Sequence, residues 1–145
     1  MAAFERHADV NWVGGLMDGT GEAKAGTGAF TLPVTFPSRI QDPAGRTSPE
    51  ELMAAAHAAC YAMALNAALG RKQASAERTD VTAKIIAELD NGIKIHTSAL
   101  SVTVYGLKGM DAADFPAFAA EAEKGCPVSN AYRGSMTITV DAKVG

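Results

Sequence analysis

Residues 48–70 read SPEELMAAAHAACYAMALNAALG and predict one long helix. Ser48 is a favourable N-cap, Pro49 suits the first helical position, and Glu51 stands three residues after the cap. Almost every later residue is a strong helix former, and Gly70 is followed by two basic residues, which is typical of a helix C-terminus. The predicted helix has about 21 residues and a length of about 31 Å.

Alanine recurs on nearly every side of this helix, so other elements can approach it closely, and we expect it to be central in the fold. The alanines stand at positions 54, 55, 56, 58, 59, 62, 64, 67 and 68. Residues 52–69 are nearly apolar, but His57 and Asn66 interrupt them and most are alanine, which is weakly hydrophobic. A buried helix is therefore predicted rather than a membrane span.

Strand patterns flank the helix on both sides. Residues 10–13 and 30–36 are short β-type runs among glycines, which indicate a hairpin or meander. Residues 81–89 and 93–104 alternate between apolar and polar side chains and are joined by Asp90-Asn91-Gly92. This second pair predicts an antiparallel hairpin with an Asn-Gly turn.

Two further elements complete the chain. Asp114 can cap a shorter helix that ends at Gly125, and residues 136–140 alternate as a closing strand. The order of strands, long helix, strand pair, short helix and strand predicts an α+β fold with helices packed on an antiparallel sheet. The length of 145 residues fits a single domain over residues 1–145.

Composition narrows the classes of partner and the compartment. Thirteen Lys and Arg against sixteen Asp and Glu give a formal net charge of -3, with no basic run, which argues against nucleic acid or an anionic membrane as the main partner. A small or neutral substrate is expected instead. Two cysteines are too few for a disulfide scaffold, and no segment resembles a secretory signal, so a reducing cytoplasm is predicted.

The two cysteines are the candidate reactive groups. Cys60 stands in the middle of the long helix among small apolar residues, where a cysteine is most often a plain buried side chain. Cys126 lies between Gly125 and Pro127, in a loop-like setting that could present its sulfur. Two thiols in a reducing compartment suit a peroxidatic and resolving pair, because a sulfenic acid condenses with a nearby thiol. Packing stays the alternative for Cys60.

A reactive thiolate in an apolar setting needs a nearby cation, because burial alone favours the neutral thiol. Arg39 is a candidate at the end of a strand-like run, and a carboxylate such as Glu50 could hold its guanidinium by a bidentate pair. The alternative is that Arg39 is a solvated loop charge and that Glu50 is only a first-turn anion of the helix.

His57 offers two weaker possibilities. It stands one helical turn before Cys60 and could act as a base, although a hydrogen-bonded core histidine is commoner. His57, Cys60 and Cys126 could also bind a metal, but the sequence has no C-x-x-C pair and no second histidine at ligand spacing. No glycine-rich stretch matches a phosphate loop.

The two cysteine segments resemble those of the OsmC/Ohr family. Residues 48–60, continued by Ala62-Met63-Ala64-Leu65, resemble its first cysteine motif, and residues 125–130 (GCPVSN) resemble its second. Trp12 and the glycines after it resemble the OsmC branch. The resemblance implies a cofactor-free thiol peroxidase for organic hydroperoxides, in which Cys60 attacks the peroxide and Cys126 resolves the sulfenic acid as an intramolecular disulfide. It also implies antiparallel sheets wrapped around long central helices in an intertwined homodimer, reduced by dithiols that include lipoyl groups.

The same resemblance assigns the supporting charges. It implies that Arg39 is the catalytic arginine, with Arg46 as the alternative, and that Glu50 is the glutamate that holds the arginine. Ten residues at about 1.5 Å per residue separate Glu50 from Cys60 by about 15 Å on one helix. The pair of Arg39 and Glu50 is therefore expected to serve the other subunit's thiol. A non-catalytic domain for an apolar ligand and a metal-binding domain remain the alternatives in other classes.

Overall fold

The computed structural model describes residues 2–145, which form two compact units. The first unit ends at Pro49, and the second is Glu50–Gly145. Each unit is described below by itself, and the single domain over residues 1–145 stays a prediction.

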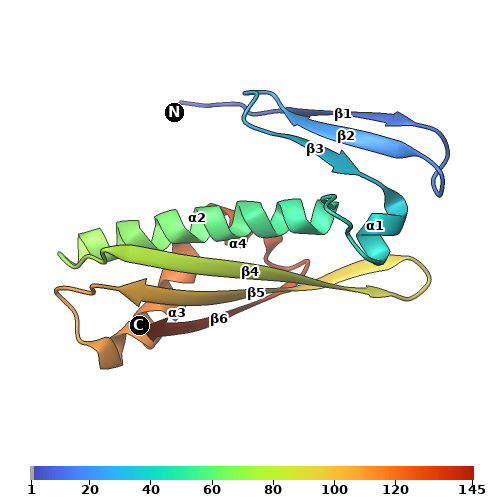
Figure 1. Cartoon of the computed structure of the whole chain (residues 1–145). Helices are drawn as coiled ribbons and strands as arrows, with labels where there is room; N and C mark the ends of the chain where they lie inside the picture. The colour runs from blue at the N-terminus through green and yellow to red at the C-terminus, as the bar shows by residue number, and fades with distance from the viewer. Residues whose placement is uncertain (1) are drawn as a thin grey trace. The chain divides into compact units, whose positions relative to one another are not determined.

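The first unit is a three-stranded antiparallel meander, as expected from its β-type runs (Figure 1). Its strands are β1 (Ala8–Val13), β2 (Thr20–Ala25) and β3 (Thr31–Val34). A short helix, α1 (Phe36–Ile40), follows where the sequence predicted only strand-like structure. The side chain of Thr35 caps this helix by accepting a hydrogen bond from the amide of Ser38 at 3.2 Å, and a proline stands in its first turn. This cap and proline overcome the local β-type composition.

The second unit begins with the long helix α2 (Pro49–Arg71), which confirms the prediction from residues 48–70. The strands β4 (Arg78–Leu89) and β5 (Ile93–Tyr105) follow as the predicted antiparallel hairpin. Asn91 and Gly92 both have positive φ in the turn, at 52° and 120°, which explains the Asn-Gly pair.

The last strand, β6 (Thr137–Val144), pairs with β5 in parallel, so the prediction of a wholly antiparallel sheet is wrong at this edge. Two helices lie between these strands: α3 (Phe115–Ala122) and α4 (Pro127–Tyr132), with 3-10 turns at Ala112–Asp114 and Glu123–Gly125. A helical connection of this kind returns the chain to the start of the neighbouring strand, and the two strands then run the same way. Asp114 makes no side-chain cap in this connection.

The core of the second unit lies between α2, α3 and the sheet. Tyr61, Leu65 and Leu69 of α2 are fully buried, and they meet the inward row of β5 and Phe115 of α3. The inward residues of β5 follow the period of two that a strand requires, at Ser98, Leu100, Val102 and Val104. The alternation of this segment in the sequence therefore decides which face of the strand meets the helix.

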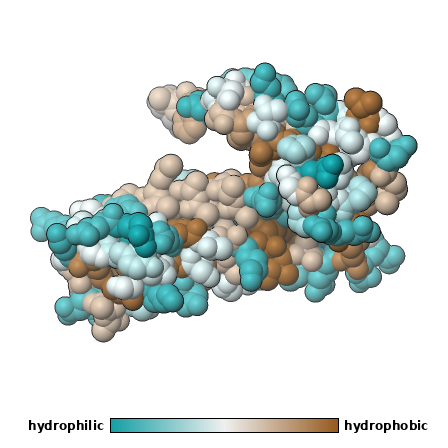
Figure 2. Space-filling model, viewed as in Figure 1, coloured by the Kyte–Doolittle hydropathy of each residue, from teal (hydrophilic) through white to brown (hydrophobic). Residues whose placement is uncertain are grey.

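α2 is long and apolar enough to cross a membrane, with a mean hydropathy of 1.4 over 18 residues, but it is the core helix of this fold. Only one face of α2 packs against the core, so 28% of the residues in this apolar stretch are buried in the single chain. The opposite face carries exposed Ala55, Ala59, Met63 and Ala67, and Figure 2 shows a pale-brown apolar strip along α2. We expected other elements to pack around α2 on all sides, but in the single chain they cover one face.

Candidate active site

The two thiols meet where α2 faces α4. Cys60 is half-buried in the middle of α2, Cys126 is fully buried, and both are free cysteines. Their side chains are close enough to interact by a hydrogen bond. Cys126 lies between two helical segments, as its loop-like sequence setting indicates, and it is the N-cap of α4. Its sulfur is buried inside the unit, so the expectation that this setting presents the sulfur is wrong.

The local sequence explains this placement of Cys126. Its backbone is extended, Pro127 opens the helix, and the amide of Ser129 donates a hydrogen bond to the Cys126 sulfur at 3.4 Å. The sulfur thus occupies the position of the side-chain oxygen in an ordinary N-cap. The amide of Cys126 donates to the carbonyl of Glu123 at 3.0 Å, which closes the preceding turn.

The surroundings of Cys60 favour its neutral thiol. Burial raises the pKa of Cys60 above its ordinary value of 9.0, a hydrogen bond from the backbone of Val128 lowers it, and the Cys126 side chain raises it again. None of these groups is a cation. The thiolate that peroxide chemistry needs must therefore be stabilised by a further positive charge.

His57 is a hydrogen-bonded core histidine. Its Nδ1 lies 2.6 Å from Oγ of Ser98, its Nε2 lies 2.7 Å from Oγ of Ser129, and all three residues are fully buried. Burial lowers the pKa of His57, and the negative charge of Glu123 offsets part of this effect. Both ring nitrogens are engaged by hydroxyl groups, so this geometry supports neither a general base nor a metal ligand at His57. Within residues 2–145, no three His, Cys, Asp or Glu side chains gather as a metal site.

Ser98 and Ser129 are buried partners of His57 that the sequence reasoning missed. Ser98 is the first of the inward residues of β5, and those after it are apolar. A polar residue at such a position indicates a buried hydrogen-bond partner, because buried polar groups are nearly always paired. Ser129 stands three residues after Cys126, at the spacing that an N-cap and its donor require. The link from either serine to His57 could not be read, because 41 and 72 residues separate them in the sequence.

Two tyrosines join α2 to the helices that follow the hairpin. The hydroxyl of Tyr61 donates to the carbonyl of Ala119 at 2.8 Å, and that of Tyr132 donates to the carbonyl of Met53 at 2.9 Å. The ring of Tyr132 also meets His57 edge to face, with centroids 5.2 Å apart. Burial raises the pKa of both tyrosines, which therefore act as neutral donors.

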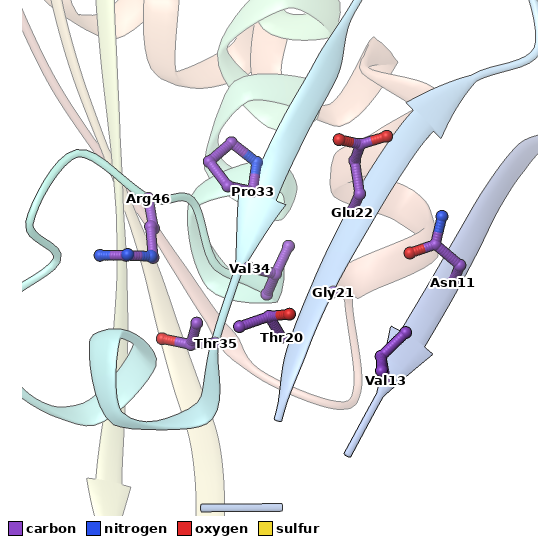
Figure 3. Close-up of a pocket in the computed structure, with 9 residues that line it drawn as sticks. All are labelled: Asn11, Val13, Thr20, Gly21, Glu22, Pro33, Val34, Thr35 and Arg46. Carbon is purple, nitrogen blue, oxygen red and sulfur yellow. The ribbon is translucent and has the colours of Figure 1, made fainter. Parts of the chain in front are cut away.

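The two candidate arginines lie in the first unit, in different surroundings. Arg39, on α1, lines a mostly apolar cavity of about 250 Å³ with Trp12, Leu16, Val34, Thr35, Phe36 and Pro49. Arg46 stands at the edge of a more polar cavity of about 370 Å³, where Asn11 and Glu22 project from neighbouring strands (Figure 3). Arg39 is half-buried, whereas Arg46 is exposed.

Glu50 stands in the first turn of α2, in the same helix as Cys60. The continuous helix keeps the two residues about 15 Å apart along its axis. The second unit therefore brings together Cys60, Cys126 and the His57 network, and α2 holds Glu50 away from the thiol of its own chain.

Comparisons with known proteins agree on one family. The profile described as "OsmC-like protein" matches residues 42–141. Peroxiredoxin OsmC of Escherichia coli (strain K12) is 33% identical over 142 residues, which cover 97% of this chain and 98% of the relative. Organic hydroperoxide resistance protein OhrA of Bacillus subtilis (strain 168) is 33% identical over 98 residues, or 66% of each chain. The crystal structure of an organic hydroperoxide resistance protein OsmC from Legionella pneumophila superposes with a TM-score of 0.77 at 26% identity, covering 99% of this chain and 100% of that one.

Proposed function

This chain belongs to the OsmC-like family and is a cysteine-based peroxidase, and on that basis we propose that it reduces organic hydroperoxides to alcohols. The observation that carries the proposal is the contact between two free thiols, Cys60 on α2 and Cys126 at the start of α4. Relatives named for organic hydroperoxide resistance support this class of substrate.

The proposed cycle has three steps. The Cys60 thiolate attacks a peroxide oxygen, the O–O bond breaks, and the alkoxide leaves as an alcohol after taking up a proton, with Cys60 oxidised to sulfenic acid. The Cys126 sulfur then attacks the sulfenic sulfur, which forms the disulfide and releases water. A dithiol finally breaks the disulfide, restores both thiols and becomes a disulfide itself.

The charge that activates Cys60 is assigned to Arg39, held by Glu50. The groups of its own unit that shift the pKa of Cys60 include no cation. An arginine would supply the positive charge that stabilises the Cys60 thiolate. Arg39 is favoured over Arg46 because it lines an apolar cavity that could also receive the organic part of a hydroperoxide. Since α2 separates Glu50 from Cys60, the pair is assigned to the partner subunit's Cys60.

We also infer that the protein is a homodimer formed through the exposed face of α2. This face carries small apolar side chains, with Ala55, Ala59 and Ala67 around Met63, whose exposed fraction is 73%. Small side chains let two helices approach closely, and a large exposed apolar patch is typical of an interface. Two α2 helices crossing here would be the long central helices of an intertwined dimer.

A dithiol of the lipoyl type is the proposed reductant, and the reducing cytoplasm is the proposed compartment. The disulfide would form where one sulfur is fully buried and the other is half-buried. A slim dithiol completes its second exchange within the mixed disulfide, whereas a bulky monothiol must enter twice.

One experiment tests the peroxidase. Reduced protein is mixed with cumene hydroperoxide, free thiols are counted over time, and dihydrolipoamide or glutathione is then added. We expect rapid loss of both thiols per chain and recovery with the dithiol. Cys60→Ser should leave the peroxide unreacted, and Cys126→Ser should consume about one peroxide per chain and stop. Unchanged thiols in the wild type would contradict the proposal and favour an apolar-ligand domain, and stoichiometric zinc in that protein would favour a metal-binding one.

A further inference from the structure

His57 is a buried titratable residue that the proposed cycle does not use. Its ring joins two segments distant in the sequence, with Nδ1 2.6 Å from Oγ of Ser98 on β5 and Nε2 2.7 Å from Oγ of Ser129 on α4. A neutral imidazole has one N–H and one lone pair, so it donates to one serine and accepts from the other. All of its hydrogen-bonding capacity therefore goes into holding these two segments.

Ser129 connects this histidine to the resolving thiol. Its hydroxyl contacts Nε2 of His57, while its amide donates to the sulfur of Cys126 at 3.4 Å. Ser129 is therefore in contact with both His57 and the Cys126 sulfur, and the position of His57 influences where that sulfur lies. The amide also directs its positive end at that sulfur, which carries negative charge once the Cys126 thiol has lost its proton.

α4 needs such an anchor because it is short. It has six residues, Pro127–Tyr132, and a helix of this length has no stability of its own in water. Its position must come from contacts with the rest of the unit. Two of these are the buried bond between Ser129 and His57 in its first turn and the half-buried bond from Tyr132 to the carbonyl of Met53 in its last turn. His57 stands one turn before Cys60 on α2, so the same helix carries both the attacked sulfur and the anchor.

We propose that His57 is a positioning residue for closure of the disulfide between Cys60 and Cys126. Its bond to Ser129 holds the first turn of α4 so that the Cys126 sulfur faces Cys60. This inference rests on the proposed function and concerns only its second step. In that step an S–S bond forms, the S–O bond of the sulfenic acid breaks, and the hydroxyl leaves with the thiol proton of Cys126 as water; the peroxide consumed in the first step is the only oxidant.

Two substitutions at one position separate anchoring from packing. The amide group of Gln overlaps Nε2 of histidine, and that of Asn overlaps Nδ1. His57→Gln therefore keeps the bond to Ser129 and loses that to Ser98, whereas His57→Asn does the reverse. Both variants remove the aromatic ring, so a merely structural role would affect them alike.

The measurement follows single turnovers with cumene hydroperoxide. Sulfenic acid is trapped with dimedone at successive times, the disulfide is quantified by thiol counting, and the first step is measured separately in a Cys126→Ser background. We expect His57→Asn to slow disulfide closure by about tenfold, in line with the loss of one buried hydrogen bond, and to accumulate sulfenic acid. His57→Gln should close within about threefold of the wild type, because it keeps the anchoring bond.

A second pair of variants keeps the test decisive if a histidine variant fails to fold. Ser129→Ala removes one oxygen from the anchor and should slow closure as His57→Asn does, while Ser98→Ala keeps the anchor and should close like the wild type. The inference is overturned if the disulfide forms at equal rates in the two histidine variants or in the two serine variants. It is also overturned if the variants slow only the reaction of Cys60 with the peroxide. A wild type that forms no disulfide with peroxide would overturn the proposed function as well, so the two failures are distinguishable.

Discussion

Arg133 donates a hydrogen bond to the carboxylate of Glu123, with Nη2 2.5 Å from Oε2. The carboxylate side chain is 7% exposed, whereas the arginine side chain is 47% exposed. The pair lies ten positions apart in the sequence and closes the segment that contains Cys126 and α4, because Glu123 precedes Cys126 and Arg133 follows the helix. α4 is thus held at its start through His57 and at its end by this ion pair.

Arg133→Ala should lower the free energy of unfolding, because it leaves a buried carboxylate without its cation. Lys124→Ala is the matched control, since Lys124 pairs with Glu121 at 2.9 Å with both side chains exposed, and it should change little. Adding Glu123→Gln to Arg133→Ala should restore part of the stability, since a buried neutral amide costs less than a buried charge. Urea unfolding measures all three, and equal losses for Arg133→Ala and Lys124→Ala would contradict the assignment.

Arg39→Ala should leave the pKa of the Cys60 thiol raised by burial, since it removes the cation that is proposed to lower this pKa. The thiolate fraction at neutral pH then falls, and alkylation of Cys60 by iodoacetamide should slow by about tenfold. Arg46→Ala is the matched control and should alkylate like the wild type. The measurement is best made in a Cys126→Ser background, so that one thiol reports. A larger effect at Arg46 would transfer the role to that residue.

A mixed dimer tests whether the charged pair acts across subunits. A Cys60→Ser chain is combined with an Arg39→Ala chain, and the heterodimer is purified with two affinity tags. If Arg39 serves the partner subunit's Cys60, one of the two sites is intact, and we expect about half of the wild-type peroxidase activity. If Arg39 serves its own chain, both sites carry a defect, and activity should match that of the inactive homodimers.

Met63→Glu should convert the proposed homodimer to a monomer, because it places a charge in the proposed contact between two α2 helices. Leu89→Glu is the matched control: Leu89 is 64% exposed at the end of β4, outside the proposed interface. Light scattering after size exclusion measures the molar mass, and circular dichroism checks that both variants are folded. A Met63→Glu protein that remains dimeric would place the interface elsewhere.

His57 should make the folded state sensitive to acid. Its pKa is lowered in the folded protein, so the unfolded chain, with an ordinary value of 6.5, binds the proton first on acidification. The contribution of His57 to stability is complete above pH 6.5 and is lost as the pH falls toward the folded-state pKa. His57→Gln removes this dependence, so its free energy of unfolding should fall less than that of the wild type between neutral pH and about pH 5. If the free energy of unfolding falls equally with pH in the wild type and in His57→Gln, the prediction is contradicted.

Local patterns in the sequence were sufficient for much of the fold. The long helix follows from its cap, proline and helix-forming residues, and the hairpin follows from alternation around Asn91-Gly92. The two cysteine motifs also led to the family, which the matching profile confirms, and to the proposal that Cys60 and Cys126 are the reactive pair. These features depend on residues close in the chain, whose propensities and hydrogen bonds act within a few positions.

Other features were decided by contacts between distant segments. The parallel pairing of β6 with β5, the short helix α4 and the burial of Cys126 depend on how α3 and α4 pack, and local propensity does not encode that packing. The same holds for His57, whose residue type alone was compatible with a base, a metal ligand or a core side chain. Its two serine partners come from β5 and α4, and only the tertiary structure brings their hydroxyls to the ring, because a buried polar group takes whichever partners the packed chain places within reach.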